Sequence, residues 1–499
     1  MGKYLKKFET RSQYESYISG EDKQLPNVSC CIEDENTYYN PLEITPEPVI
    51  NTDLIAKFNV TSTSGATNIC GSTSNFSEIE IDGVVQPSVT YNYLFTTTGE
   101  HTVKYTLVNS TTIGNSAFSY CYNMTSIVIP NDVTTIDNSA FQNCNSLTSI
   151  EIPNNVTTIG DYAFQNCYSL TGTLTIPNSV TSIGREAFVN SNSLKSVVIN
   201  CSSIGRGCFE RSGLETVEFG NNVTTIGENA FFMCPKLKSV VIPSSVTTIG
   251  YCAFYKCETL VSAIINGGAI GQCAFSLCNN LSYLKLGDNV TTIGTDAFSY
   301  CSSLKSIYIP SNVTDIGNSA FRNTSAKYII LHNNGTVGQY AFGMSSGLTV
   351  KVLYIGSNSS PSNTYSSSEL YGLETLYLNN DDGWCFRYSS CYGTLINVIF
   401  GNNITTIADY AFYGLSKITN IVLPSSITSI GNYAFNSCSL LSCVTVEATT
   451  PPTFGSSAIT KGYNANNFKI FVPAESVEAY KAASGWSSLA SYIEAIPTT

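Results

Sequence analysis

The stretch Ile242–Cys257, "IPSSVTTIGYCAFYKC", decides the fold because the chain repeats it with small changes. Near copies begin at Ile152, "IPNNVTTIGDYAFQNC", and at Ile129, "IPNDVTTIDNSAFQNC". Aligned on the phenylalanine of this phrase, the copies are mostly 21–24 residues apart, and a period in this range indicates a solenoid. A degenerate copy around Phe386 brings the array to about 14 units, whose other phenylalanines are Phe118, Phe141, Phe164, Phe188, Phe209, Phe231, Phe254, Phe275, Phe298, Phe321, Phe342, Phe412 and Phe435.

The unit that begins at Leu304, "LKSIYIPSNVTDIGNSAFRN", starts with a strand-like alternation of apolar and polar residues. Pro310 ends the strand because proline removes a ladder donor, and Gly317 is expected to make a turn at positive φ. One unit cannot bury its apolar face alone, so neighbouring units must stack, at roughly 4.8 Å per coil and on the order of 65 Å in all. The residues expected to face inward are Leu304, Ile307, Ile309, Val313, Ile316, Ala320 and Phe321.

Low charge and few histidines exclude several classes of function. Only 12% of the 499 residues are charged and the net charge is −12, so no basic stripe is available for nucleic acid or an anionic membrane surface. The two histidines, His101 and His332, leave little room for zinc-protease, Ser-His-Asp or Cys-His chemistry. No run of about 18 apolar residues predicts a transmembrane helix. We therefore expect no enzyme, no nucleic-acid partner and no membrane insertion.

The 18 cysteines follow the repeat. Eight of them are expected to form an inward-facing column of small, weakly polar residues. Cys252 and Cys273 add two C-A-F-x-x-C phrases, for which a zinc site and a pair of small apolar ladder positions are the alternatives. The second is favoured because no C-x-x-C occurs. The column three residues after the phenylalanine holds Cys121, Cys144, Cys167, Cys234, Cys257, Cys278, Cys301 and Cys438.

We divide the chain into four parts. Residues 1–43 are a polar leader or docking segment, and residues 44–109 are a small β-sandwich-like domain that caps the first repeat. Residues 110–446 are the repeats. Residues 447–499 form a C-terminal cap with a short amphipathic helix, for which Ser476 is the predicted N-cap.

The repeats are interrupted by an irregular, Ser-rich insert at 343–395. Such a loop on a rigid scaffold could determine specificity; a decayed repeat with a solvated loop is the preferred interpretation. Asp381 and Asp382 could contribute to a calcium site, but the EF-hand spacing is absent.

The phrase I-P-x-x-V-T-x-I-G-x-x-A-F-x-x-C, followed by L-x-x-[IV]-x-[IL]-P, resembles the BspA-like (Treponema pallidum-type) leucine-rich repeat over residues 110–446. The resemblance implies a mostly β, right-handed solenoid with non-catalytic surface recognition as its function. Family members are usually secreted or surface-anchored, whereas no secretory signal is visible here. Residues 1–43 resemble leaders of proteins from gut Bacteroidales and their phages, which favours docking to other virion proteins.

No catalytic, cofactor-binding or metal-binding residue is expected. The candidate ligand face is a set of aromatic residues on the outward side of the strands, which could stack on sugar rings or anchor a protein. The equally weighted alternative is that tyrosine simply favours strands. The candidate residues are Tyr283, Tyr308, Tyr328, Tyr354, Tyr377 and Trp384.

The sequence thus favours a recognition or adhesion rod that binds a protein or glycan on a host or cell surface. A phage virion or other particle-associated attachment protein is the preferred form. The alternatives are a bacterial cell-surface adhesin and a structural spacer without a specific ligand. The expected location is the extracellular surface or a virion, with a cytoplasmic location left open.

Overall fold

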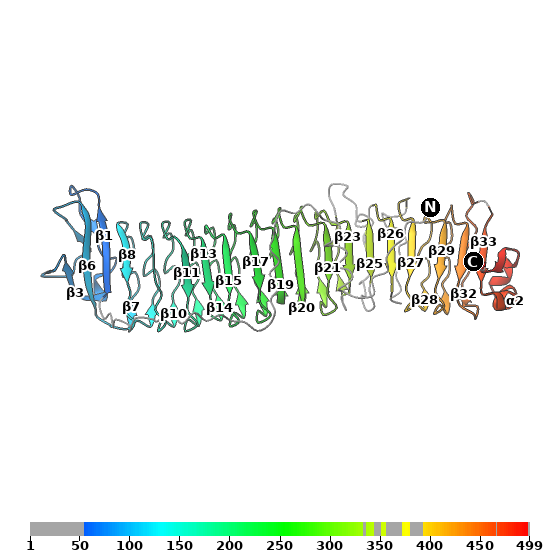
Figure 1. Cartoon of the computed structure of the whole chain (residues 1–499), viewed down its shortest axis with the longest axis horizontal. Coiled ribbons are helices and arrows are strands. Elements are labelled where there is room, and N and C mark those ends of the chain that lie inside the picture. The colour runs from blue at the N-terminus through cyan, green and yellow to red at the C-terminus, as the bar shows by residue number, and fades with distance from the viewer. Residues whose placement is uncertain are drawn as a thin grey trace. The chain divides into compact units, whose positions relative to one another are not determined.

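The computed structural model describes residues 54–332, 336–343, 351–355, 372–379, 393–465 and 467–497. By its contacts the chain divides into two units, Met1–Val49 and Ile50–Thr499, and every described residue belongs to the second. That unit is mostly β, with a solenoid of about 15 turns, as the sequence predicts (Figure 1). The predicted leader at 1–43, Asp381, Asp382 and Trp384 lie outside the described residues.

The N-terminal part of this unit is an antiparallel sheet that continues into the first coil of the solenoid. Strand β1 pairs on one side with β6 and on the other with β8, which belongs to that coil. A second, two-stranded sheet and a 3-10 helix, η1, complete this part. The elements are β1 (Leu54–Val60), β2 (Thr67–Asn68), η1 (Thr73–Asn75), β3 (Phe76–Ile81), β4 (Val84–Val85), β5 (Asn92–Tyr93), β6 (Gly99–Leu107) and β8 (Met124–Val128).

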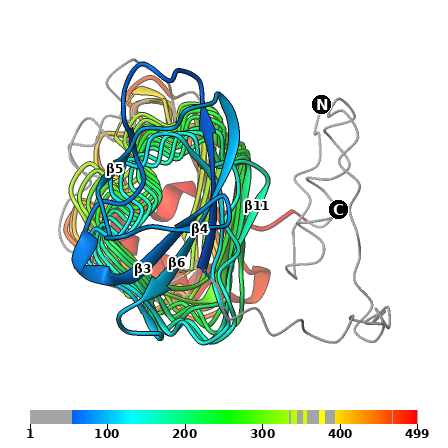
Figure 2. The same ribbon diagram turned by 90° about the vertical axis from the view of Figure 1, so that its left-hand side faces the viewer.

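One side of the solenoid is built from four-residue strands, and their coils lie behind one another in the end-on view (Figure 2). Neighbours pair in parallel with equivalent residues opposite each other, such as Ile307 and Ile329. The strands are β11 (Thr173–Ile176), β13 (Ser196–Ile199), β15 (Thr216–Phe219), β17 (Ser239–Ile242), β21 (Ser306–Ile309), β23 (Tyr328–Leu331), β25 (Val352–Ile355), β26 (Thr375–Leu378), β27 (Asn397–Phe400), β29 (Asn420–Leu423), β31 (Cys443–Val446) and β33 (Lys469–Val472), with β34 (Ile493–Ala495) last.

A second side is built from two-residue strands, each formed by the Thr-Ile of the repeated phrase or its equivalent. The longer strands β19 (Ser262–Ile270) and β20 (Tyr283–Ile293) run through both sides. The short strands are β7 (Thr112–Ile113), β9 (Thr135–Ile136), β10 (Thr158–Ile159), β12 (Ser182–Ile183), β14 (Ser203–Ile204), β16 (Thr225–Ile226), β18 (Thr248–Ile249), β22 (Asp315–Ile316), β24 (Thr336–Val337), β28 (Thr406–Ile407), β30 (Ser429–Ile430) and β32 (Thr453–Phe454).

The phenylalanines of the repeat form a stack of parallel rings through the core. The ring centroid of Phe254 lies 5.0 Å from that of Phe231 and 4.9 Å from that of Phe275, with interplanar angles of 6° and 8°. The backbone also links the coils here, because the N–H of Phe254 donates to the carbonyl oxygen of Ala274 at 2.7 Å. Each ring thus covers the apolar face of the next coil, as the repeat predicts.

Thiols and hydroxyls form ladders parallel to the ring stack. Cys257 Sγ donates to the carbonyl oxygen of Phe231 in the preceding coil at 3.2 Å. The same hydrogen bond is made by Cys144, Cys167, Cys234, Cys278, Cys301 and Cys438. On another edge, Thr247 Oγ1 donates to the carbonyl oxygen of Thr224 at 3.1 Å. Short side chains therefore satisfy backbone carbonyls of the preceding coil. This explains why the chain is rich in Ser, Thr and Cys and has few charged residues. The prediction of an inward-facing cysteine column is confirmed.

The prediction for the repeat glycine is wrong. Gly317 does not have a positive φ; that conformation belongs to Ser319 and Asn323, with φ of 55° and 58°. A Cβ added to Gly317 would lie 2.4 Å from the backbone nitrogen of Thr295 in the preceding coil. The glycine is therefore required by close approach between coils rather than by its own turn.

The left-handed positions of the repeat hold residues other than glycine. At such a position, glycine should be more stabilising than alanine. Lys256 has φ of 57°, a conformation that costs a residue with a Cβ roughly 1–2 kcal/mol. Lys256→Gly should therefore be about 1 kcal/mol more stable than Lys256→Ala after allowing for the greater chain entropy of glycine. Chemical denaturation of both variants checks this, and an alanine variant of equal or higher stability would contradict it.

The C-terminal cap contains η3 (Ala474–Ser476), α2 (Val477–Ala482) and η4 (Trp486–Tyr492). Trp486 is buried and its Nε1 donates to the carbonyl oxygen of Pro452 at 2.9 Å. Ser476 precedes α2 as predicted, but it does not cap the helix: its hydroxyl donates to the carbonyl oxygen of Thr449 at 2.7 Å. Across the part of the chain that is described, no helix has the length and apolar character needed to span a bilayer.

Candidate functional site

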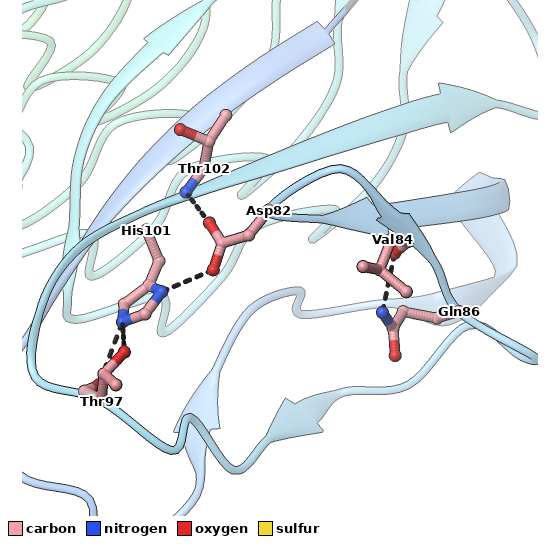
Figure 3. A network of polar contacts seen from close by, with 6 residues as sticks. All are labelled: Asp82, Val84, Gln86, Thr97, His101 and Thr102. Carbon is pink, nitrogen blue, oxygen red and sulfur yellow. Dashed lines mark hydrogen bonds and ion pairs between the residues drawn. The ribbon is translucent and has the colours of Figure 1, made fainter.

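The arrangement that most resembles a catalytic site lies in the N-terminal sheet, around His101 (Figure 3). His101 Nδ1 is 2.7 Å from Asp82 Oδ2, and His101 Nε2 is 3.0 Å from the carbonyl oxygen of Thr97 and 3.4 Å from Thr97 Oγ1. Asp82 Oδ1 also accepts a hydrogen bond from the N–H of Thr102 at 2.9 Å. These contacts join the turn after β3 to β6.

The hydrogen-bond partners of His101 indicate a structural role. A carboxylate and a carbonyl oxygen can only accept, so these contacts favour the imidazolium form, in which both ring nitrogens of His101 donate. In that form the ring has no lone pair to take the proton of the Thr97 hydroxyl. It is buried against Phe95, with centroids 4.3 Å apart. This group of residues stabilises the sheet.

The pKa values of the two histidines should be shifted in opposite directions. Burial would lower the pKa of His101, but its hydrogen bonds to Asp82 and the carbonyl of Thr97 outweigh burial and raise it. Burial lowers the pKa of His332. NMR titration of 13C-labelled histidines should give one midpoint above and one below the ordinary value of about 6.5, with the higher midpoint falling in Asp82→Asn. Coincident midpoints would contradict the arrangement.

The sign of the stability effect follows from the same hydrogen bonds. Because the folded-state pKa of His101 is raised, its contribution is complete below the ordinary histidine pKa and is lost as the pH rises through the raised value. Hydrogen bonds from His101 and Thr102 outweigh burial and lower the pKa of Asp82, so its contribution is lost only as the pH falls through that lowered value. The ion pair therefore stabilises the sheet between the two pKa values.

Three of the predicted tyrosines lie in one column on the outward side of the four-residue strands. The register places Tyr308 opposite Ile330, Ile330 opposite Tyr354, Tyr354 opposite Tyr377 and Tyr377 opposite Ile399. The ring centroids of Tyr354 and Tyr377 are 6.1 Å apart. These side chains are half-buried against one another, so five consecutive coils present a continuous aromatic and aliphatic strip.

His332 completes this strip and was not among the predicted site residues. Its ring centroid lies 5.6 Å from Tyr308 and 5.3 Å from Tyr354, so it fills the space above Ile330 between the two rings. The signal was present in the sequence: in "YIILH" from Tyr328 the alternation continues one residue further, where the preceding repeat has Pro310. We call Tyr308, Ile330, His332, Tyr354, Tyr377 and Ile399 the tyrosine patch.

The remaining predicted face residues are not part of this column. Tyr283 and Tyr328 occupy the neighbouring outward column, where their partners include Ser262 and Val352, and about half of each side chain is exposed. Trp384 lies outside the described residues. The predicted tyrosines therefore belong to two columns. Only the column of Tyr308, Tyr354 and Tyr377 forms a continuous strip.

The charges beside the tyrosine patch are mostly positive, although the chain is acidic. Lys305, Lys327 and Lys351 occupy equivalent places in three consecutive coils, linked by backbone hydrogen bonds of 2.8 and 2.9 Å. Lys351 pairs with Glu374, whereas no described carboxylate pairs with Lys305 or Lys327. Burial keeps the pKa of His332 below and that of Tyr377 above their ordinary values, so both rings are neutral at pH 7. The patch thus combines neutral rings with a lysine row.

No described group of three or more His, Cys, Asp or Glu side chains is arranged to hold a metal ion. Cys252 and Cys273, the residues of the zinc alternative, lie in adjacent coils without a third ligand of this kind.

Comparison with known proteins gives one family and several solved structures. The model of the BspA type leucine-rich repeat region (6 copies) matches residues 111–238, 224–349 and 385–484. No curated protein sequence matches the chain. Among solved structures, a leucine-rich repeat protein from Bacteroides ovatus is 23% identical, covering 75% of this chain and 88% of that protein with a TM-score of 0.37.

Two further structures align over different lengths. A leucine-rich cell surface protein from Faecalibacterium prausnitzii is 24% identical, covering 70% of this chain and 91% of that protein with a TM-score of 0.29. The T. pallidum leucine-rich repeat protein is 26% identical, covering 35% of this chain and 72% of that protein with a TM-score of 0.26. The family match covers more than half of the chain, and it carries the assignment.

Proposed function

Because the chain belongs to the BspA-type leucine-rich repeat family, we propose that it is a non-catalytic recognition protein of the cell surface whose tyrosine patch binds a protein partner. The observation that carries the proposal is the in-register column from Tyr308 to Ile399 with His332 between its rings. Aromatic side chains held by a rigid scaffold offer large contact area at low entropic cost, which is why tyrosine is common among binding hot spots.

The chemistry of the patch favours a protein segment with acidic residues. Tyr354 and Tyr377 supply apolar contact, while Lys305 and Lys327 are exposed in the neighbouring coils of Tyr308 and Ile330 and can attract carboxylates. An extended segment that runs along the solenoid would meet equivalent groups at each coil, roughly every 4.8 Å. A glycan remains the alternative ligand, because the same rings can stack on sugars, and binding to a glycan alone would favour it.

The test compares two double variants on an array of purified extracellular-matrix proteins and glycans. Tyr354→Ala with Tyr377→Ala removes the centre of the patch and should weaken binding to a matrix protein by about 2 kcal/mol, roughly 30-fold. Tyr120→Ala with Tyr122→Ala is the matched control, since both tyrosines are exposed and stack edge to face at 6.0 Å in the first coil. Equal binding by the two variants would contradict the patch as the site, and no binding to any probe would favour the spacer.

A virion-associated attachment role is the second candidate. It rests on the resemblance of residues 1–43 to leaders of proteins from gut Bacteroidales and their phages. Immunogold labelling of cells and of purified phage particles from the source culture distinguishes the two: label on the cell envelope favours the surface protein, and label on particles favours the virion role.

A further inference from the structure

Two cysteines of adjacent coils face each other near the surface of the solenoid. Cys252 and Cys273 each lie two residues before the phenylalanine of their repeat, with φ of 52° and 55°. The N–H of Cys252 donates to the carbonyl oxygen of Gln272 at 3.0 Å, which places the two residues at the same level of one backbone ladder. Each thiol affects the pKa of the other, as expected for neighbouring side chains on one ladder.

These two thiols differ from the cysteines of the buried column. Cys257 and Cys278 are fully buried, and each Sγ donates to a phenylalanine carbonyl of the preceding coil. Cys273 is only half-buried, and Cys252 in the adjacent coil has 5% of its surface exposed. A small molecule can therefore reach Cys273, and Cys252 is the nearest thiol to it.

We propose that Cys252 and Cys273 form a disulfide that links two consecutive coils when the protein meets a small-molecule disulfide such as oxidised glutathione. Equivalent residues in stacked coils are separated by about 4.8 Å between Cα atoms, which lies inside the range of about 4.4–6.8 Å found for disulfides. The link requires no change of register.

The reaction is two successive thiol–disulfide exchanges. Cys273 loses its proton, its thiolate attacks one sulfur of glutathione disulfide, and one glutathione leaves as the thiol. Cys252 then attacks the Cys273 sulfur of this mixed disulfide, and the second glutathione leaves. In total two protein thiols are oxidised and one disulfide is reduced to two glutathione thiols. Burial raises the pKa of Cys273 to about 11, so the first step should be slow at neutral pH and faster at pH 9.

The chain contains two internal controls. Cys234 and Cys257 are also equivalent residues of adjacent coils, but both are fully buried, so they are neighbours without access. Cys443 is half-buried like Cys273, but its ladder neighbours are Asn420 and Lys469, so it has access without a thiol partner. The proposal predicts a different product at each of the three places.

The experiment incubates the folded full-length chain with a reduced and oxidised glutathione mixture, quenches with acid, and maps every cysteine by peptide mass spectrometry. We expect a 252–273 linked peptide, glutathione on Cys443, and unmodified thiols at Cys234 and Cys257. Thiols at Cys252 and Cys273 under conditions that modify Cys443, or glutathione on each of them without a link, would overturn the proposal.

The variant Cys252→Ser separates access from pairing. Serine occupies the same place in other repeats, as at Ser139 and Ser319, so the variant should fold. Without its partner, Cys273 should retain glutathione to the same extent as Cys443. If Cys273 stays a thiol in this variant, it is not accessible and the proposal is wrong.

Discussion

Replacing Phe254 with alanine should lower the free energy of unfolding by about 3–5 kcal/mol. Its ring is fully buried between those of Phe231 and Phe275, at 5.0 and 4.9 Å. Its removal leaves a cavity that the neighbouring coils cannot close, because their backbones are fixed by hydrogen bonds such as Phe254 N–H to Ala274 O. Denaturant unfolding followed by circular dichroism measures the loss.

The matched control for this prediction is Phe232→Ala. Phe232 follows a core phenylalanine directly and stacks on Tyr255 at 5.1 Å, but it is only half-buried. The same chemical change should therefore cost about 1 kcal/mol there, close to the average for single mutations. Equal losses at Phe232 and Phe254 would show that the ring stack does not carry the stability of the array.

The second large effect is expected at a repeat glycine. A Cβ added to Gly250 would lie 2.6 Å from the backbone nitrogen of Glu228 and from the carbonyl carbon of Gly227. Backbone atoms of a stacked coil cannot move aside singly, so Gly250→Val should cost about 3 kcal/mol, the upper part of the range for overpacking. The thermal unfolding midpoint should fall accordingly.

Gly65→Val is the control for the glycine prediction. A Cβ at Gly65 would have no atom within 4 Å, and its φ is not positive. This variant should therefore be neutral to within about 0.5 kcal/mol. A tolerated valine at Gly250 would mean that the coils are not in the close contact described.

The sequence predicted the ring stack and the inward residues because they recur at fixed positions of every repeat. Every coil must bury the same face, so the period alone identifies Phe254, Ile307 and Val313 as core. The role of Gly317 could not be predicted in the same way. A glycine in a repeat indicates either a left-handed backbone or a close contact, and only the spacing between coils decides between the two.

The arrangement of the candidate residues was predicted only in part for a related reason. Alternation within one strand correctly placed Tyr308, Tyr354 and Tyr377 outward, but it does not determine which outward residues are neighbours across coils. The coils between Phe321 and Phe412 are irregular, so counting from the repeat cannot give that register. His332 was missed because the repeat usually has proline at this position. When one coil lacks the proline, the change is easily interpreted as loss of the strand.

Successive coils stack in one register, so that equivalent side chains form continuous columns. Pulsed electron–electron double resonance tests this stacking because it measures the distance between two spin labels. The labels are attached to genetically encoded ketone amino acids, so that the native cysteines are not labelled. One pair replaces Thr175 and Lys285, and the other replaces Thr175 and Val422. Strand pairing gives the register within three groups of this column, and the repeated phrase aligns the groups with one another. The groups are Thr175, Val198 and Glu218; Val241, Ile264 and Lys285; and Tyr308, Ile330, Tyr354, Tyr377, Ile399 and Val422.

At roughly 4.8 Å per coil, we expect about 24 Å for the first pair and about 53 Å for the second, before the length of the labels is added. Label length contributes equally to both pairs, so their difference of about 29 Å is the decisive quantity. Two narrow distributions separated by that amount would agree with a single stacked register. Broad distributions, or a second distance that does not grow with the number of coils, would contradict it.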